Sequence, residues 1–158
     1  MFKNKSFIKS LKTAFFGILK PFRTEINLRF HFMIGNLIIL FAHFYGISKI
    51  EWAVLILTIA LVFCAELVNT ALENAVDTAT NEYKKTAEAA KDAAAGAVLF
   101  AAVCAVVVGF FLFFDLDRLS EVLTYIFTTP KVLIPSLILG IADILFVVFG
   151  GKQNYRTN

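Results

Sequence analysis

The stretch WAVLILTIALVFCAELVNTALENAVD, residues 52–77, decides how this chain is interpreted. Its first half is apolar enough to begin a membrane-spanning helix. Its second half places four polar side chains three or four residues apart: Glu66, Asn69, Glu73 and Asp77. A helix that begins in hydrocarbon and ends in acids needs a physical reason for those acids.

The composition indicates a membrane protein. Of the 158 residues, 59% are hydrophobic and 18 are phenylalanine, and the mean hydropathy is +0.77. A soluble domain of this length would leave much apolar surface in water, so lipid is the expected solvent. The net charge of +3 is too small to indicate nucleic acid binding. Cys64 and Cys104 lie apart in apolar runs, which predicts two buried thiols rather than a disulfide or a metal site.

Four segments approach the roughly 20 apolar residues that a helix needs to cross a bilayer core. They are residues 30–47, 52–74, 93–114 and 132–149. We therefore predict an all-α integral membrane protein. Its parts are an N-terminal segment (1–29), a core of three spans (30–115), an extracytoplasmic loop (116–131), and a fourth span with a cytoplasmic tail (132–158).

The N-terminal segment has the pattern of an amphipathic helix. Apolar residues recur every three or four positions, and lysines fall between them: Phe7, Leu11, Phe15, Ile18 and Phe22, with Lys5, Lys9, Lys12 and Lys20. That pattern is typical of a helix lying in the membrane interface, with its basic face toward anionic headgroups. Pro21 is expected to bend or divide it.

Basic residues set the expected orientation. With the N-terminus in the cytoplasm, twelve of the fifteen lysines and arginines fall on the inner side, and only Lys49, Arg118 and Lys131 fall outside. The positive-inside rule then predicts that both termini are cytoplasmic.

The four polar residues of the second span share one face of the helix. At about 100° per residue, Asn69, Glu73 and Asp77 all lie within about 60° of Glu66. Glu66 lies roughly 21 Å along the helix from Trp52, below the midplane. A carboxylate at that depth costs at least about 2 kcal/mol unless it faces a partner, a cavity or another helix.

Two explanations fit this stripe. It could form interhelical hydrogen bonds that hold a bundle together, which is the favoured reading for Asn69 alone. It could also form a polar site open to the cytoplasm, where the deeper acid accepts a proton and a shallower one binds a divalent cation. Lys84, Lys85, Lys91 and Asp92 follow at the inner surface. Lys91 beside Asp92 puts a cation and an anion where phosphates and a metal would meet.

These motifs resemble those of the small prokaryotic integral-membrane lipid kinases, which include diacylglycerol kinase and undecaprenol kinase. AELVNTALENAVD carries the family's E-x-x-N-x-x-x-E signature, and EYKKTAEAAKDAAAGAVL its lysine–aspartate pair before small residues. In FRTEINLRFH, a glutamate (Glu25) is followed four residues later by an arginine (Arg29). The resemblance covers about residues 6–115.

The resemblance implies an ATP-dependent lipid kinase with Mg²⁺ as its metal. It makes Glu66 the catalytic base that takes the proton from the lipid hydroxyl, and Glu25 and Glu73 the magnesium ligands. It assigns nucleotide contacts to Glu82, Tyr83, Lys84, Lys91 and Asp92, and supporting places to Asn69, Asp77 and Arg29. Members are homotrimers with shared active sites, so Glu25 need not meet Glu73 of its own chain.

The sequence departs from the family in two places. Ser6 stands where some members have an arginine that contacts the nucleotide, and the chain continues into a fourth span that carries Asp143. For Asp143 we favour a buried acid that forms a hydrogen bond.

The expected reaction is phosphorylation of a lipid alcohol at the cytoplasmic face of a bacterial membrane, with undecaprenol as the first candidate and diacylglycerol as the alternative. The rivals are a non-enzymatic ion or proton relay and a lipid-phosphate phosphatase. A phosphatase lacks an evident nucleophile, since His31 and His43 lie near opposite ends of the first span.

Overall fold

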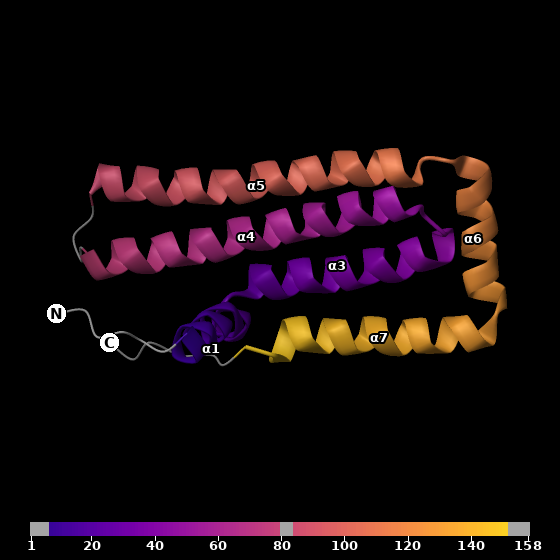
Figure 1. Cartoon of the computed structure of the whole chain (residues 1–158), viewed down its shortest axis with the longest axis horizontal. Coiled ribbons are helices and arrows are strands. Elements are labelled where there is room, and N and C mark those ends of the chain that lie inside the picture. The colour runs from indigo at the N-terminus through magenta and orange to yellow at the C-terminus, as the bar shows by residue number, and fades with distance from the viewer. Residues whose placement is uncertain (1–6, 80–83, 152–158) are drawn as a thin grey trace.

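The computed structural model describes residues 7–79 and 84–151, and these residues are helical apart from short connections, with no β-strand among them. The helices in order are α1 (Phe7–Leu19), α2 (Pro21–Thr24), α3 (Ile26–Tyr45), α4 (Lys49–Ala79), α5 (Lys85–Phe113), α6 (Leu116–Thr128) and α7 (Pro130–Phe149). Figure 1 shows α3, α4, α5 and α7 running side by side. α6 lies across one end of this bundle, and α1 lies at the other end.

The four long helices are each long and apolar enough to cross a membrane. The predicted all-α membrane fold, including the span beyond the three-span core, is therefore confirmed. α4 and α5 are longer than the predicted spans, with 31 and 29 residues. Their additional turns are rich in alanine, glutamate and lysine, which favour helix, so the backbone stays helical after the apolar run ends.

The N-terminal segment is divided at Pro21, as predicted. α1 ends at Leu19, and Pro21 occupies the first turn of α2, where its missing N–H removes no helical hydrogen bond. Glu25 follows with an extended backbone and separates α2 from α3. None of the α1 residues is buried, which fits a helix that rests on a lipid surface.

The connection at residues 116–131, predicted as a loop, contains the 13-residue helix α6. The Asp115 side chain caps it by accepting from the Arg118 N–H at 3.1 Å. Leu119, Val122 and Ile126 recur at helical spacing, and Val122 joins the core cluster with Ala42, Tyr45, Ile47 and Leu55. This amphipathic pattern was present in the sequence, and the surrounding charged residues obscured it.

The bend between α3 and α4 depends on local hydrogen bonds. Gly46 ends α3 with a left-handed backbone (φ 71°), and its carbonyl accepts from Arg118 at 2.9 Å. Ser48 and Glu51 form a capping box, in which the Ser48 N–H donates to Glu51 at 2.7 Å and the Glu51 N–H donates to the Ser48 hydroxyl at 3.3 Å. These contacts fix the end of the bundle opposite α1.

Two sequence interpretations concern single residues within the spans. Asp143 is 5% exposed and accepts a hydrogen bond from Asn36 at 3.0 Å, which confirms a buried hydrogen-bonding acid and joins α7 to α3. The prediction of two buried thiols is wrong: both cysteines are free, but Cys64 is exposed on the outside of α4 and Cys104 is only half-buried. A thiol behaves as a small apolar group, so it can face lipid on a span.

Candidate active site

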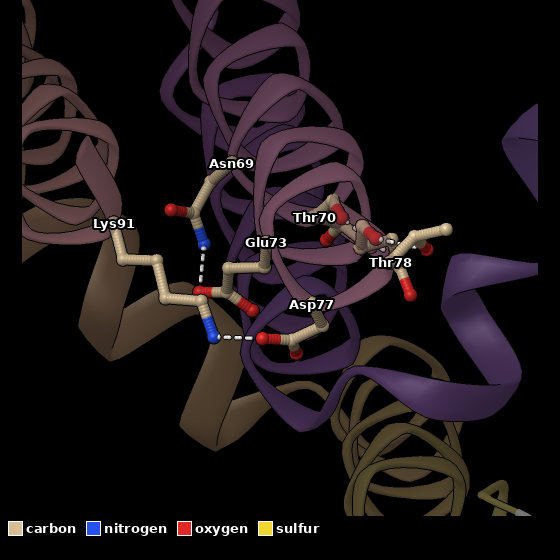
Figure 2. Close-up of polar contacts among 7 residues, drawn as sticks. Asn69, Thr70, Glu73, Asp77, Thr78 and Lys91 are labelled. Atoms are coloured by element: carbon tan, nitrogen blue, oxygen red, sulfur yellow. Dashed lines mark hydrogen bonds and ion pairs between the residues drawn. The ribbon is translucent and has the colours of Figure 1, made fainter. Parts of the chain in front are cut away.

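The acidic stripe of α4 passes from buried to exposed along the helix. Glu66 is 3% exposed and Asn69 9%, whereas Glu73 is half-buried and Asp77 is exposed. Figure 2 shows Asn69, Glu73 and Asp77 on the side of α4 that faces Lys91. The predicted shared face therefore exists, and the burial of Glu66 requires a partner for its carboxylate.

That partner is His31, from the second turn of α3. Its Nε2 atom lies 3.1 Å from Oε1 of Glu66. Sequence reasoning gave His31 no role. The available signal was an ionisable side chain in the inner part of a span, which is costly in lipid without a partner.

Asn69 and Glu73 interact within α4. The Asn69 amide donates to Oε1 of Glu73 at 2.9 Å (Figure 2). The oxygen of this amide, Oδ1, is buried and has no hydrogen-bond partner among the residues that the structure describes. Asn69 thus fixes the Glu73 carboxylate and leaves an acceptor free beside it.

Lys91 meets the end of the stripe. Its ammonium group pairs with the Asp77 carboxylate across α4 and α5 (Figure 2). Asp92 and Lys84 are exposed near the start of α5. The predicted nucleotide contacts Glu82 and Tyr83, like Ser6, lie outside the described residues.

Glu25 approaches the stripe from the N-terminal side. It lines a cavity of about 720 Å³ between α1, α2 and α4, which also includes Lys20, Thr70 and Asn74. Glu25 therefore faces the same cavity as residues of α4, the helix that carries Glu66 and Glu73.

Magnesium is compatible with these residues. Within residues 7–79 and 84–151, no three His, Cys, Asp or Glu side chains form a ready-made metal site. Mg²⁺ does not need one, because it is usually held by one or two carboxylates together with substrate phosphates and water. Glu25 and Glu73 supply two carboxylates, and the free Asn69 oxygen adds a neutral acceptor beside Glu73.

Arg29 lies away from the stripe. Its guanidinium donates to the Phe22 carbonyl at 2.9 Å and to the Val147 carbonyl at 3.1 Å. Of the two ion pairs found in the part of the chain that the structure describes, neither joins Arg29 to Glu25. Arg29 therefore contacts α2 and α7 rather than the acids.

A second cavity lies beside His31, the partner of the buried acid. It measures about 640 Å³, lies between α3, α4 and α5, and is almost wholly apolar. His31, Phe30 and Phe63 line its inner part, and Phe41 and Phe113 line it further along α3 and α5. Because His31 borders this cavity and also contacts Glu66, a single side chain separates the carboxylate from an apolar space.

A family model described as prokaryotic diacylglycerol kinase matches residues 12–113. The chain belongs to the prokaryotic diacylglycerol kinase family. The match takes in α2 to α5 and most of α1, and it stops before α6 and α7. The predicted class, a lipid kinase, is confirmed by this membership.

Individual relatives agree with the family. The chain is 40% identical over 107 residues to an undecaprenol kinase of Bacillus subtilis, covering 68% of this chain and 87% of that protein. It is 46% identical over 101 residues to a diacylglycerol kinase of Synechocystis, covering 63% of this chain and 58% of that protein. A diacylglycerol kinase of Haemophilus influenzae is 34% identical over 109 residues, covering 68% of this chain and 92% of that protein. No solved structure matches the chain.

Proposed function

We propose that this protein transfers the γ-phosphoryl group of ATP to the hydroxyl of a membrane lipid alcohol, namely undecaprenol. The observation that carries the proposal is the buried Glu66 carboxylate, held by His31 at the edge of an apolar cavity. A base for a lipid hydroxyl has to stand where hydrocarbon and polar groups meet.

Glu66 serves as the general base. The lipid oxygen attacks the γ-phosphorus as its proton passes to Glu66, and the bond from that phosphorus to the β–γ bridging oxygen breaks, releasing ADP. The 3% exposure of Glu66 keeps water from competing for the same phosphoryl group. His31 orients the carboxylate through the 3.1 Å contact.

Magnesium and the nucleotide belong to the shallower part of the stripe. Glu73, oriented by Asn69, and Glu25 hold Mg²⁺, which when bound neutralises phosphate charge. Lys91, on α5, would contact the nucleotide together with Lys84 and Asp92, which are exposed near the start of α5. Glu82 and Tyr83, the other proposed nucleotide contacts, lie outside the described residues. The Lys91 ammonium group beside the acids favours binding of a triphosphate that carries Mg²⁺.

Undecaprenol is the preferred substrate because of the relative from Bacillus subtilis, of whose length the chain covers 87%. Diacylglycerol is the alternative, on the strength of the 46% identity to the Synechocystis protein. The apolar cavity is compatible with either, since it offers hydrocarbon-like walls and few polar groups.

Orientation and assembly are part of the same proposal. The excess of lysine and arginine puts both termini and the stripe on the cytoplasmic side of a bacterial cell membrane, where ATP is available. The family resemblance favours a homotrimer. Ala101 is the one buried residue of α5, which leaves an extensive apolar surface for lipid or neighbouring subunits.

The test uses purified protein in lipid, Mg-ATP labelled in its γ-phosphate, and separate undecaprenol and diacylglycerol substrates. We expect label in undecaprenol, and loss of at least about a hundredfold in rate for Glu66→Gln, which keeps the size of the side chain but cannot accept the proton. Label in diacylglycerol alone would select the alternative. If neither lipid is labelled while ions still bind, the relay hypothesis replaces the kinase.

A further inference from the structure

The position of Glu25 depends on a short bend in the chain. Its backbone is extended (φ −103°, ψ 115°), between the end of α2 and the start of α3, and its N–H donates to the Pro21 carbonyl at 2.7 Å. We call residues 21–26 the elbow. Because Glu25 is the residue at which the direction changes, the angle between α2 and α3 decides where its carboxylate points.

Arg29 fastens the elbow to the fourth span. It is 5% exposed, and its guanidinium donates to the Phe22 carbonyl in α2 and to the Val147 carbonyl in α7. Val147 lies in the last turn of α7, and Phe22 lies in α2, which is a single turn long. Carbonyl groups there lack partners within the helix, and the helix dipole favours a cation beside them. One buried cation thus joins the ends of α2 and α7.

Side-chain packing reinforces this connection. The Phe146 ring of α7 lies 5.9 Å from the Phe32 ring and 6.3 Å from the Phe22 ring, between centroids. After α7, the chain passes so close to Arg29 that a Cβ atom on Gly151 would lie 2.7 Å and 2.8 Å from two of its nitrogens. Only glycine fits at position 151 without displacing the guanidinium.

We propose that α7 positions Glu25 and so acts as a brace for the elbow. Arg29 is the positioning residue, because its hydrogen bonds connect α7 to the elbow. The elbow lies within the family-matched residues 12–113, and α7 lies outside them. The inference rests on the proposed function, in which Glu25 is a magnesium ligand. It gives the fourth span a role at the active site that acts through the elbow.

The first experiment compares Gly151→Ala with Gly140→Ala in the full-length protein. Gly140 lies in α7, and a Cβ there meets nothing within 4 Å, so it is a matched control. We expect Gly151→Ala to weaken equilibrium binding of a magnesium-loaded, non-hydrolysable ATP analogue on the order of tenfold. The amides of the elbow should exchange hydrogen faster than in the control, while kcat at saturating Mg-ATP stays close to wild type. If Gly151→Ala matches Gly140→Ala in binding and exchange, the brace is overturned.

A double-mutant cycle tests whether the effect acts through Glu25. In a Glu25→Gln background, Gly151→Ala should cause little further loss of analogue binding, because the group that it misplaces has already been removed. An equal loss in both backgrounds would show that α7 acts elsewhere and would overturn the proposal.

Two further controls separate the possible failures. If Gly151→Ala does not fold, Phe146→Leu replaces it, and unchanged elbow exchange and analogue binding in that variant overturn the brace. If the wild-type protein phosphorylates no lipid, the proposed function fails. The exchange comparison still decides whether α7 holds the elbow, because it needs no catalysis.

Discussion

Replacing His31 with leucine tests the contact on which the proposed base depends. In the wild type, Nε2 of His31 lies 3.1 Å from Oε1 of a carboxylate that is 3% exposed. Leucine keeps an apolar lining for the neighbouring cavity but has no hydrogen-bond donor for the carboxylate. The Glu66 carboxylate would then lose the partner that orients it toward the lipid.

The structure sets the expected size of the effect. A hydrogen bond to a charged group contributes about 1.5–3 kcal/mol, and about 1.4 kcal/mol corresponds to a factor of ten in rate. We therefore expect His31→Leu to lower kcat between about tenfold and about 150-fold. His31→Gln retains an N–H donor and should recover much of that loss.

The assay is phosphorylation of the lipid alcohol at saturating Mg-ATP, with kcat and the KM for Mg-ATP measured separately. His43→Leu is the control, since His43 lies near the other end of α3 and is exposed. We expect kcat to fall for His31→Leu alone, with little change in the KM for Mg-ATP. Wild-type kcat in His31→Leu, or an equal loss in His31→Gln, would refute the positioning role.

Three further predictions address the metal, the fourth span and the α3–α4 bend. Glu73→Gln should raise the magnesium concentration needed for half-maximal rate on the order of tenfold, and an unchanged requirement would count against its role as a ligand. Asn36→Leu should lower the free energy of unfolding in detergent by about 1 kcal/mol, because Asp143 loses its hydrogen-bond donor. Adding Asp143→Leu should restore part of that loss. Wild-type stability of the single variant would contradict this prediction. Gly46→Ala should cost roughly 1–2 kcal/mol in the same measurement, because φ is 71° there, whereas Gly109→Ala, where a Cβ meets nothing within 4 Å, should not destabilise.

Much of the fold could be predicted because lipid imposes strong rules on sequence. All four spans were predicted, with bounds within a few residues except at the end of α4 and the start of α5, and Pro21 was predicted to divide the N-terminal segment. α6 was missed because it does not cross the membrane: it crosses the end of the bundle, where only every third or fourth residue needs to be apolar. The sequence did not predict the last turns of α4 or the first turns of α5. Hydropathy indicates where a helix leaves lipid, whereas the backbone hydrogen bonds of the helix can continue into water.

The site was predictable along one helix and less so between helices. Periodicity was enough to put Asn69, Glu73 and Asp77 on one face, because residues of a single helix keep a fixed geometry. It could not pair His31 with Glu66, since that contact depends on how α3 packs against α4. For the same reason the sequence favoured no partner for Arg29 in α7, which lies 118 residues away along the chain.

The order of burial along α4 explains why the proposed roles cannot be exchanged. Mg²⁺ keeps several of its water molecules when it binds, so its ligand has to stand near water, as the half-buried Glu73 does. The base has to meet a lipid hydroxyl where water is scarce, because water at that place would divert the phosphoryl group to hydrolysis. Glu66 is buried and adjoins the apolar cavity through His31, whereas Asp77 is exposed and pairs with Lys91. A kinase that transfers a phosphoryl group from a soluble nucleotide to a lipid needs a buried acid near the lipid and a more exposed acid near water. The order of burial along α4 meets this requirement.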